Sequence, residues 1–205
     1  MSEEMSPEQL VDACRRLAER GLATSTSGNL SCRKGPAVFA TPTGVSLGEV
    51  SAEALSRTDL GGQQIAGPKP TKEIGLHLAI YQAYSDVSAV VHVHPTHAVA
   101  VSTLLEAGAV LPSVTPQFVM RAGRVPVLPY APPGSDRLGP WLAESKAQKA
   151  VCLQNHGVVT FGADFQHALG TLEELEENCR LWLLTGGRGR ILDDHEVTEL
   201  LDRRM

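Results

Sequence analysis

The stretch Ala89-Val90-Val91-His92-Val93-His94-Pro95 decides how this chain is interpreted. Its apolar residues predict a short buried strand whose polar members are two histidines. Side chains alternate between the two faces of a strand, so His92 and His94 point to one side and the valines between them to the other. Pro95 cannot donate to a sheet ladder, so we expect the strand to end there with both imidazoles at its carboxyl edge. Two imidazoles on one side can bind the same ion at the usual zinc–nitrogen distance of about 2.0–2.1 Å.

So short a motif also fits two ordinary histidines that are hydrogen-bonded to backbone. A third histidine changes the balance, because His156 lies in the turn Asn155-His156-Gly157 between two apolar segments, 150–154 and 158–161. We expect Gly157 to permit a backbone turn that few other residues could make. Three histidines are the composition of a catalytic zinc site that keeps one position open.

A carboxylate precedes the histidine pair. Glu73 is near the start of an expected helix that Thr71 would N-cap, and the helix dipole there favours the anionic form of Glu73. Two interpretations stay open for Glu73: a fourth group of the site, or a solvated carboxylate in the first turn. His77, one turn further along, is expected to pack in the core or behind the site rather than to bind a metal.

Three small polar turns offer groups that suit a phosphate. Gly28-Asn29, Thr43-Gly44 and Thr71-Lys72 supply hydroxyls, an amide, backbone N–H groups at a helix start and one ammonium. Phosphate prefers such donors. No one of these turns by itself indicates phosphate binding, and the sequence has no P-loop motif.

Strands and helices intermix along the chain, which predicts the α/β class. Its 205 residues fit a single domain, 1–205, because no internal repeat or linker divides them. Helices are expected at 7–20, 71–84, 96–106, 136–146, 164–184 and 194–201, and strands at 37–40, 89–94, 125–128, 150–154 and 158–161.

The composition excludes several classes of function. The chain carries 18 basic and 23 acidic residues, a net charge of −5, which disfavours binding to nucleic acid. No apolar run approaches the roughly 20 residues that cross a bilayer, so no membrane partner is expected. The acidic start, residues 1–5, does not resemble a secretory signal. Four scattered cysteines form no C-x-x-C pair, and reduced thiols in a cytoplasmic protein are the simplest expectation.

Five motifs in order resemble the signature of the class II aldolase/adducin superfamily, over about residues 8–185. They are Gly28-Asn29-Leu30-Ser31, Thr41-Pro42-Thr43-Gly44, Pro70-Thr71-Lys72-Glu73, His92-Val93-His94 and Asn155-His156-Gly157. The resemblance implies a three-layer α/β/α fold with a central mixed, mainly antiparallel sheet, and a homotetramer. It also implies one Zn²⁺ per subunit on His92, His94 and His156, with Glu73 as acid/base. Gly28, Asn29, Thr43, Gly44, Thr71 and Lys72 would bind the phosphate end of the substrate.

Within the superfamily, three segments are most similar to 3-oxo-tetronate 4-phosphate decarboxylases: 70–73, 96–100 and 115–120. Sugar-phosphate aldolases more often carry two serines where this chain has Thr71-Lys72, so Lys72 adds a cation beside the phosphate or a substrate carboxylate. The chain also departs from the decarboxylases, which tend to have Pro-Tyr-Tyr-Arg-Pro-Gly at 129–134. Here that segment reads Pro-Tyr-Ala-Pro-Pro-Gly, which leaves the exact substrate open. The tail, 202–205, lacks the aromatic residue that some aldolases place over the active site.

The resemblance therefore implies a zinc-dependent carbon–carbon lyase that acts on a small phosphorylated sugar or sugar acid through an enediolate, which the metal stabilises as a Lewis acid. We expect decarboxylation of the 3-oxo-tetronate 4-phosphate type. The alternatives are aldol cleavage as in fuculose-phosphate aldolase, a metal-free adducin-like scaffold, and zinc-dependent hydrolysis. Adducin-like members lack the metal histidines that this chain keeps, which favours an enzyme. His97 either supports the metal ligands from behind or has no part in the site, and His195 is expected on the surface.

Overall fold

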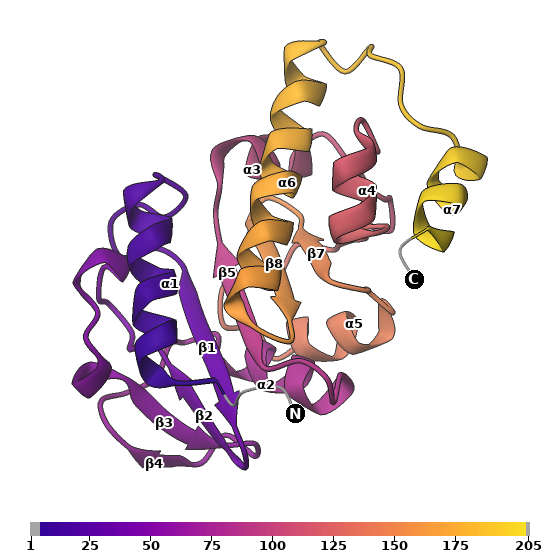
Figure 1. The fold of residues 1–205 in the computed structure, drawn as a ribbon. Helices are drawn as coiled ribbons and strands as arrows, with labels where there is room; N and C mark the ends of the chain where they lie inside the picture. The colour runs from indigo at the N-terminus through magenta and orange to yellow at the C-terminus, as the bar shows by residue number, and fades with distance from the viewer. Residues whose placement is uncertain (1–4, 204–205) are drawn as a thin grey trace.

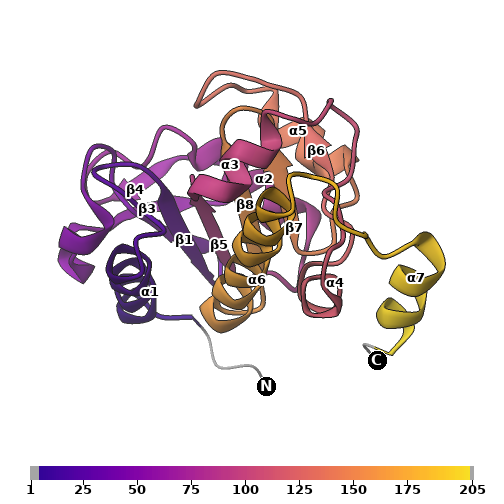
Figure 2. The ribbon, with the colours of Figure 1, turned by 90° about the horizontal axis from the view of Figure 1, so that it is seen from above.

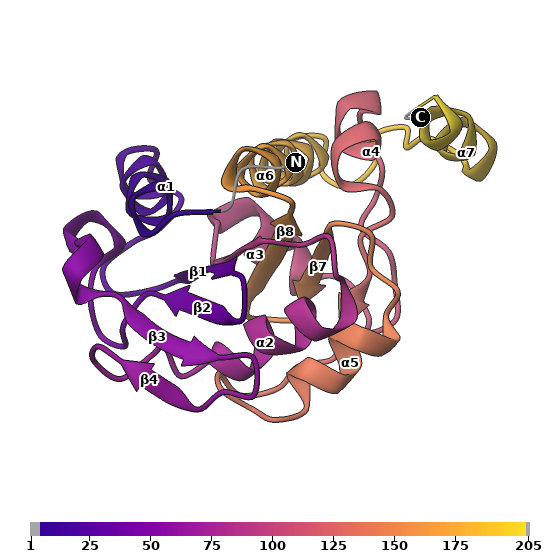
Figure 3. The same cartoon turned by 60° about the horizontal axis from the view of Figure 1, so that its bottom comes forward.

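An eight-stranded sheet, in the order β4-β3-β2-β1-β5-β8-β7-β6, forms the centre of the molecule and carries helices on both faces (Figures 1 and 3). This computed structural model describes residues 5–203, so most of the acidic start and the end of the tail, 204–205, lie outside the described residues. The strands are β1 (Asn29–Lys34), β2 (Ala37–Ala40), β3 (Ser56–Asp59), β4 (Gln64–Ala66), β5 (Ala89–Val93), β6 (Val127–Leu128), β7 (Ala150–Leu153) and β8 (Gly157–Gly162). The helices are α1 (Pro7–Glu19), α2 (Ile74–Ala83), α3 (Thr96–Ser102), α4 (Pro116–Ala122), α5 (Leu138–Glu144), α6 (Phe165–Leu184) and α7 (Asp194–Asp202), with short 3₁₀ turns η1 (Leu47–Glu49) and η2 (Ala52–Ala54).

Strand pairing confirms the predicted mixed, mainly antiparallel sheet. β6 and β7 are parallel, whereas the other neighbouring strands are antiparallel. β5 lies in the interior of the sheet, with Asn29 of β1 opposite His92 on one side and Val159 of β8 opposite it on the other. The predicted central strand is therefore held by hydrogen bonds along both edges.

The two faces of the sheet pack against different helices, which completes the predicted three layers. Val91 and Val93 belong to the core shared with α1, α4 and α6, whereas Val90 belongs to the core shared with α2 and α5. In Figure 3 the first group of helices lies above the sheet and the second group below it. Because side chains alternate, His92 lies on the same face as Val90, under α2.

Several elements differ from the sequence prediction. Gly28-Asn29 was expected to be a turn, but β1 begins at Asn29, and both Asn29 and Ser31 are buried. The strands β3 and β4 and the helix α4 were not predicted at all. Thr115 caps α4 by accepting a hydrogen bond from the N–H of Phe118, and Pro116 occupies its first turn, so this helix has an ordinary start signal.

Three predicted boundaries were wrong for local reasons. The helix expected at 96–106 ends at Ser102, where the N–H of Leu104 bonds to Val101 in a tighter turn. The strand expected at 125–128 keeps only its last two residues, because the carbonyl of Val125 instead accepts from Leu111. Glu73, not Thr71, is the N-cap of α2, although the Thr71 hydroxyl accepts a hydrogen bond from the N–H of Glu73 at 3.3 Å.

Candidate metal centre and substrate cavity

The three predicted histidines converge at the carboxyl end of β5. β5 and the residue after it supply His92 and His94, and the turn between β7 and β8 supplies His156. The turn arrives there because Val93 of β5 is paired with Val158 of β8. The ring centroids of the three imidazoles are 4.8, 5.0 and 5.1 Å apart. Glu73 completes the group, and one ligand atom from each of the four residues lies within 4.8 Å of the others.

A backbone contact sets the orientation of the His92 ring. Its Nδ1 lies 2.9 Å from the carbonyl oxygen of Val158, which can only accept, so Nδ1 carries the proton. The other nitrogen, Nε2, then presents its lone pair to the group. It is buried without a hydrogen-bond partner, and it lies 3.1 Å from Oε2 of Glu73. Two electron-rich atoms held this close in a buried site fit a cation bound between them.

Burial keeps the remaining two imidazoles in the form that binds metals. Burial, followed by the neighbouring charges of His92 and His156, lowers the pKa of His94 to about 4. Burial also lowers the pKa of His156, with a smaller effect from His92. Nδ1 of His156 is buried without a hydrogen-bond partner. Neutral imidazole is the state that coordinates a metal, so the set fits a divalent ion.

Glu73 is nearly fully buried and held at one of its two oxygens. Oε2 accepts a hydrogen bond from the side-chain amide of Asn29 at 3.0 Å. Oε1 has no hydrogen-bond partner and lies 3.5 Å from Nε2 of His156. Burial raises the pKa of Glu73, whereas the hydrogen bond from the Asn29 amide to Oε2 lowers it. Glu73 is therefore a buried carboxylate of the group, not the solvated first-turn residue of the alternative interpretation.

Gly157 is required by space and not by backbone conformation, which corrects the sequence interpretation. The residue of this turn with positive φ is Asn155, at 54°. A Cβ added at Gly157 would lie 2.6 Å from Cδ2 of His94 and 2.6 Å from the carbonyl oxygen of Val93. The missing side chain thus lets the histidine turn approach the end of β5 closely.

A cavity of about 320 Å³ opens beside the four residues and collects the predicted phosphate-binding turns. Its wall includes Gly28, Asn29, Thr43, Gly44, Thr71 and Lys72, together with Glu73, His94 and His156. Pro133, from the segment in which the chain departs from the decarboxylase pattern, also lines it. Residues from six separate stretches of the sequence therefore meet at one concave surface. The assigned roles of the individual residues remain predictions.

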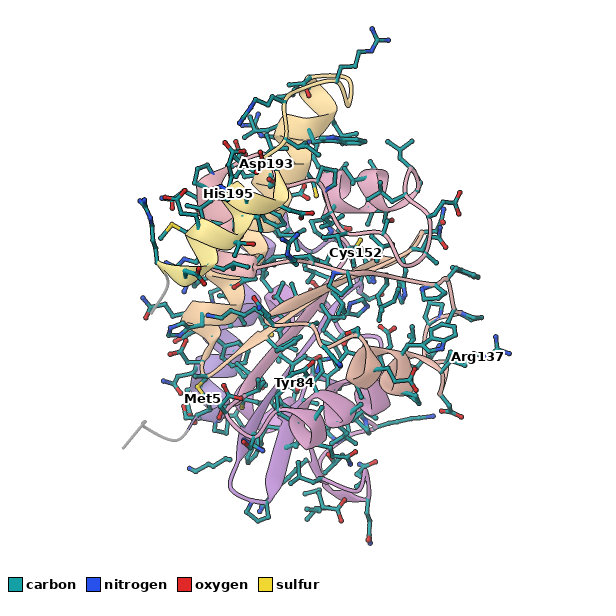
Figure 4. All side chains as sticks on the ribbon, turned by 90° about the vertical axis from the view of Figure 1, so that its right-hand side faces the viewer. Met5, Tyr84, Arg137, Cys152, Asp193 and His195 are labelled. Carbon is teal, nitrogen blue, oxygen red and sulfur yellow. The ribbon has the colours of Figure 1, made fainter. Side chains whose placement is uncertain are left out.

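The structure separates His97 and His195 from this group. Nδ1 of His97 lies 2.7 Å from Oε1 of Glu176, which also accepts from the backbone N–H of His97, so His97 anchors α3 to α6. It has no contact with the metal group among the described interactions. His195 belongs to α7, which stands at the edge of the molecule beyond α4 (Figures 1, 2 and 4).

Sequence reasoning missed a buried polar chain behind Glu73. His77 lies 2.6 Å from Oδ1 of Asn29 and 2.7 Å from the hydroxyl of Ser31, and that hydroxyl lies 2.8 Å from the hydroxyl of Tyr81. Two spacings in the sequence could have indicated this polar chain. Asn29 and Ser31 are two apart on a strand, and Glu73, His77 and Tyr81 are four apart at and along a helix, so each set shares one face.

Comparisons with known proteins agree with this geometry. The family model described as Class II Aldolase and Adducin N-terminal domain matches residues 8–183. The 3-oxo-tetronate 4-phosphate decarboxylase of Pectobacterium atrosepticum is 41% identical over 204 residues, which cover 97% of this chain and 94% of that protein. The L-fuculose phosphate aldolase of Methanococcus maripaludis is 37% identical over 177 residues, 86% of this chain and 96% of that protein. The crystal structure of YgbL from Klebsiella pneumoniae superposes with a TM-score of 0.89 at 40% identity, covering 95% of this chain and 96% of that one. The predicted resemblance is thus confirmed, and the chain belongs to the class II aldolase and adducin family.

Proposed function

We propose that this protein is a zinc-dependent carbon–carbon lyase that decarboxylates a small phosphorylated 3-oxo sugar acid of the 3-oxo-tetronate 4-phosphate type. One observation carries the proposal. Three imidazoles and a buried carboxylate converge on one point, and they do so beside a cavity whose wall also includes the turns predicted to bind phosphate. Relatives bearing the decarboxylase name, at 34–41% identity over nearly the whole chain, support this reaction.

His92, His94 and His156 would hold the metal ion, because each ring can direct the lone pair of one nitrogen at the ion. In His92 this nitrogen is Nε2, which has no hydrogen-bond partner. Three imidazoles are the ligand set of zinc sites that leave a position open for substrate. When bound, zinc supplies a Lewis acid that polarises substrate oxygens and offsets the negative charge left when the carbon–carbon bond breaks.

Glu73 would handle the proton at Oε1. Oε2 is engaged by Asn29, whereas Oε1 has no hydrogen-bond partner and is directed toward His156, at the cavity wall. Loss of CO2 leaves an electron pair on the carbon that carried the carboxylate, and one proton must be placed there. The resting carboxylate takes up that proton at Oε1 from solvent or a substrate hydroxyl and delivers it to this carbon.

Lys72 and the turns would bind the phosphate. Lys72 is exposed at the cavity rim beside the buried Thr71, and Gly44 lies on the same wall. An ammonium bound to the departing carboxylate would stabilise the ground state and oppose the loss of CO2. We therefore assign Lys72 to the phosphate and not to the carboxylate that leaves.

Aldol cleavage is the second candidate, and the similarity to the L-fuculose phosphate aldolase of Methanococcus maripaludis favours it. The same residues could serve, since both reactions leave a charge next to a carbonyl carbon. The leaving fragment would then be an aldehyde, and Glu73 would return to carbon the proton that it took from the hydroxyl. The two reactions differ in product and not in the residues required.

A panel of phosphorylated ketoses and 3-oxo sugar acids tests the proposal, with CO2 and aldehyde release both measured on protein of known zinc content. CO2 from a 3-oxo acid supports decarboxylation, and aldehyde from a ketose phosphate supports the aldolase alternative. Hydrolysis without carbon–carbon cleavage would identify a zinc hydrolase. Purified protein that holds no stoichiometric zinc and turns over no member of the panel would identify an adducin-like scaffold.

We further infer a homotetrameric, cytoplasmic enzyme. Large apolar side chains remain exposed on the single chain, including Leu104, Met120 and Tyr130, and burial against other copies would remove them from water. All four cysteines are free and buried, which suits a reducing compartment. No helix among the described residues is long and apolar enough to cross a membrane. Light scattering that gives a fully active monomer of 21.9 kDa would refute the tetramer.

A further inference from the structure

Behind Glu73, five side chains form one continuous chain of hydrogen bonds that crosses from α2 to β1 and back. It runs Tyr81–Ser31–His77–Asn29–Glu73, with heavy-atom distances of 2.8, 2.7, 2.6 and 3.0 Å. His77 and Ser31 are completely inaccessible, and the other three are buried. Ser31, His77 and Tyr81 therefore cannot exchange their partners for water, and the direction of each bond in the chain follows from its neighbours.

The carboxylate end sets the direction of the chain. Ionised Glu73 can only accept, so the Asn29 amide must present its NH₂ group to Oε2 and its carbonyl Oδ1 to His77. Nε2 of His77 must then carry the proton that it donates to Oδ1. Burial lowers the pKa of His77 to about 3, so its ring is neutral and Nδ1 accepts from the Ser31 hydroxyl.

The opposite end enforces the same direction. With Ser31 donating to His77, the Ser31 oxygen is available to accept from the hydroxyl of Tyr81. If the chain ran in reverse, Ser31 would accept from His77, and either the Ser31 or the Tyr81 O–H would lose its acceptor. Both hydroxyls are buried, and an orphaned buried donor is unfavourable. Both ends thus select one orientation of the Asn29 amide.

We propose that His77 is a positioning residue that locks the Asn29 amide with its NH₂ group toward Glu73 and so fixes the carboxylate relative to the three metal-binding histidines, a role that rests on the proposed function of Glu73. Rotating the amide would bring its carbonyl oxygen against the carboxylate. That contact would be repulsive and would turn Glu73 away from Asn29. Among the described hydrogen bonds the His77 ring contacts Asn29 and Ser31, and His77 does not itself line the cavity, so its ring acts on Glu73 through Asn29.

The first test reads the tautomer of His77 directly, by nitrogen NMR of histidine-labelled wild-type protein, both metal-free and zinc-loaded. His77→Gln assigns the signal. We expect the Nε2–H tautomer in both forms, with no titration of this ring between about pH 5 and 9. An Nδ1–H tautomer would mean that the chain runs the other way, and it would overturn the proposal.

The second test compares His77→Phe, which keeps a ring of similar size but has no donor, with His77→Gln, which keeps an N–H for Asn29. We expect His77→Phe to lower kcat about 10–100-fold with KM and zinc content within about twofold, and His77→Gln to restore most of the loss. His167 is exposed, so His167→Phe serves as the matched control and should leave kcat, KM and zinc content unchanged. Equal kcat in wild type and His77→Phe, or a loss shared by kcat, KM and zinc content that His77→Gln does not restore, would contradict a positioning role.

The two tests separate this inference from the proposed function. If neither His77 variant folds, the His77 ring signals of the wild-type protein are assigned instead by through-bond correlation from its backbone, and its tautomer still decides the orientation. If the zinc-loaded wild type releases neither CO2 nor aldehyde, the proposed function fails while the NMR result stands. If the wild type is active and His77 carries its proton on Nδ1, only the positioning role fails.

Discussion

Replacing Gly157 with alanine places one methyl group between the histidine turn and the end of β5. The added Cβ would lie 2.6 Å from Cδ2 of His94 and from the carbonyl oxygen of Val93. Ordinary contacts begin at 3.4 Å, so these atoms must separate by about 0.8 Å. The Val93 carbonyl is part of a strand paired on both edges, whereas the His94 ring follows the strand, so we expect the ring and the turn to give way.

A movement of this size exceeds what a metal site tolerates. Ligand distances in metal sites stay within about 0.2 Å of their usual values, and disturbing the support of one ligand typically costs about 10–100-fold in metal affinity. We therefore expect Gly157→Ala to weaken zinc binding at least 10-fold. The extra atom in a packed region should also lower the free energy of unfolding of the metal-free protein by about 1–3 kcal/mol.

Zinc competition with a chelator and urea unfolding without metal measure the two effects. Gly75→Ala is the matched control, because Gly75 lies in the first turn of α2, has no positive φ, and a Cβ there would have no atom within 4 Å. Gly75→Ala should keep the zinc affinity and raise the free energy of unfolding by up to about 1 kcal/mol, since alanine stabilises a helix more than glycine does. The reasoning is refuted if Gly157→Ala binds zinc within about threefold of wild type and unfolds within about 0.5 kcal/mol of it.

Substitutions of His92, Glu73 and Lys72 and one change of pH test the remaining assignments. His92→Ala should remove both zinc and activity while His195→Ala removes neither, and elemental analysis that finds full zinc in His92→Ala would refute the ligand assignment. Glu73→Gln should lower kcat about 10²–10⁴-fold with little change in KM, since it removes a proton carrier but no uniform binding. Lys72→Ala should raise KM more than it lowers kcat, and steady-state kinetics on both variants decides between these patterns. Because the pKa of His77 falls from 6.5 to about 3 on folding, the unfolded chain alone binds this proton at pH 5. The metal-free protein should therefore lose about 2 kcal/mol of stability from this residue between pH 7 and 5, and His77→Phe should show that much less dependence in urea unfolding.

The features that the sequence predicted well are those with local causes. The side-chain alternation of a strand placed His92 and His94 on one face without any tertiary information. The helix expected from residue 7 also begins there, where Ser6 and Gln9 form a capping box at the start of α1. The convergence of His156 and Glu73 depends on strand order, which no local pattern contains. It could be expected only from the resemblance of the motifs to a known family.

The strand β1 was missed because its pattern contradicts the usual rule for a buried strand. Leu30 and Cys32 face the core shared with α1, whereas Asn29 and Ser31 face α2, and both faces are buried. Alternation of polar and apolar residues normally indicates a strand with one face exposed to solvent. Together with the preceding run of serines and threonines, the polar residues were interpreted as a turn. The same stretch becomes a strand only because α2 offers polar partners to its second face.

That choice of residues has an energetic consequence that links the fold to the site. On the α2 face the sheet is apolar at Val38, Val90 and Val159, and it becomes polar at Asn29 and Ser31. Burying these polar groups contributes less stability than burying valines of similar size would, because their hydrogen bonds mostly replace bonds to water. Such a buried chain of hydrogen bonds can satisfy all its donors in only one direction, and it therefore fixes the orientation of its side chains. The fold thus places buried polar residues directly behind Glu73, whose carboxylate lies beside three histidines.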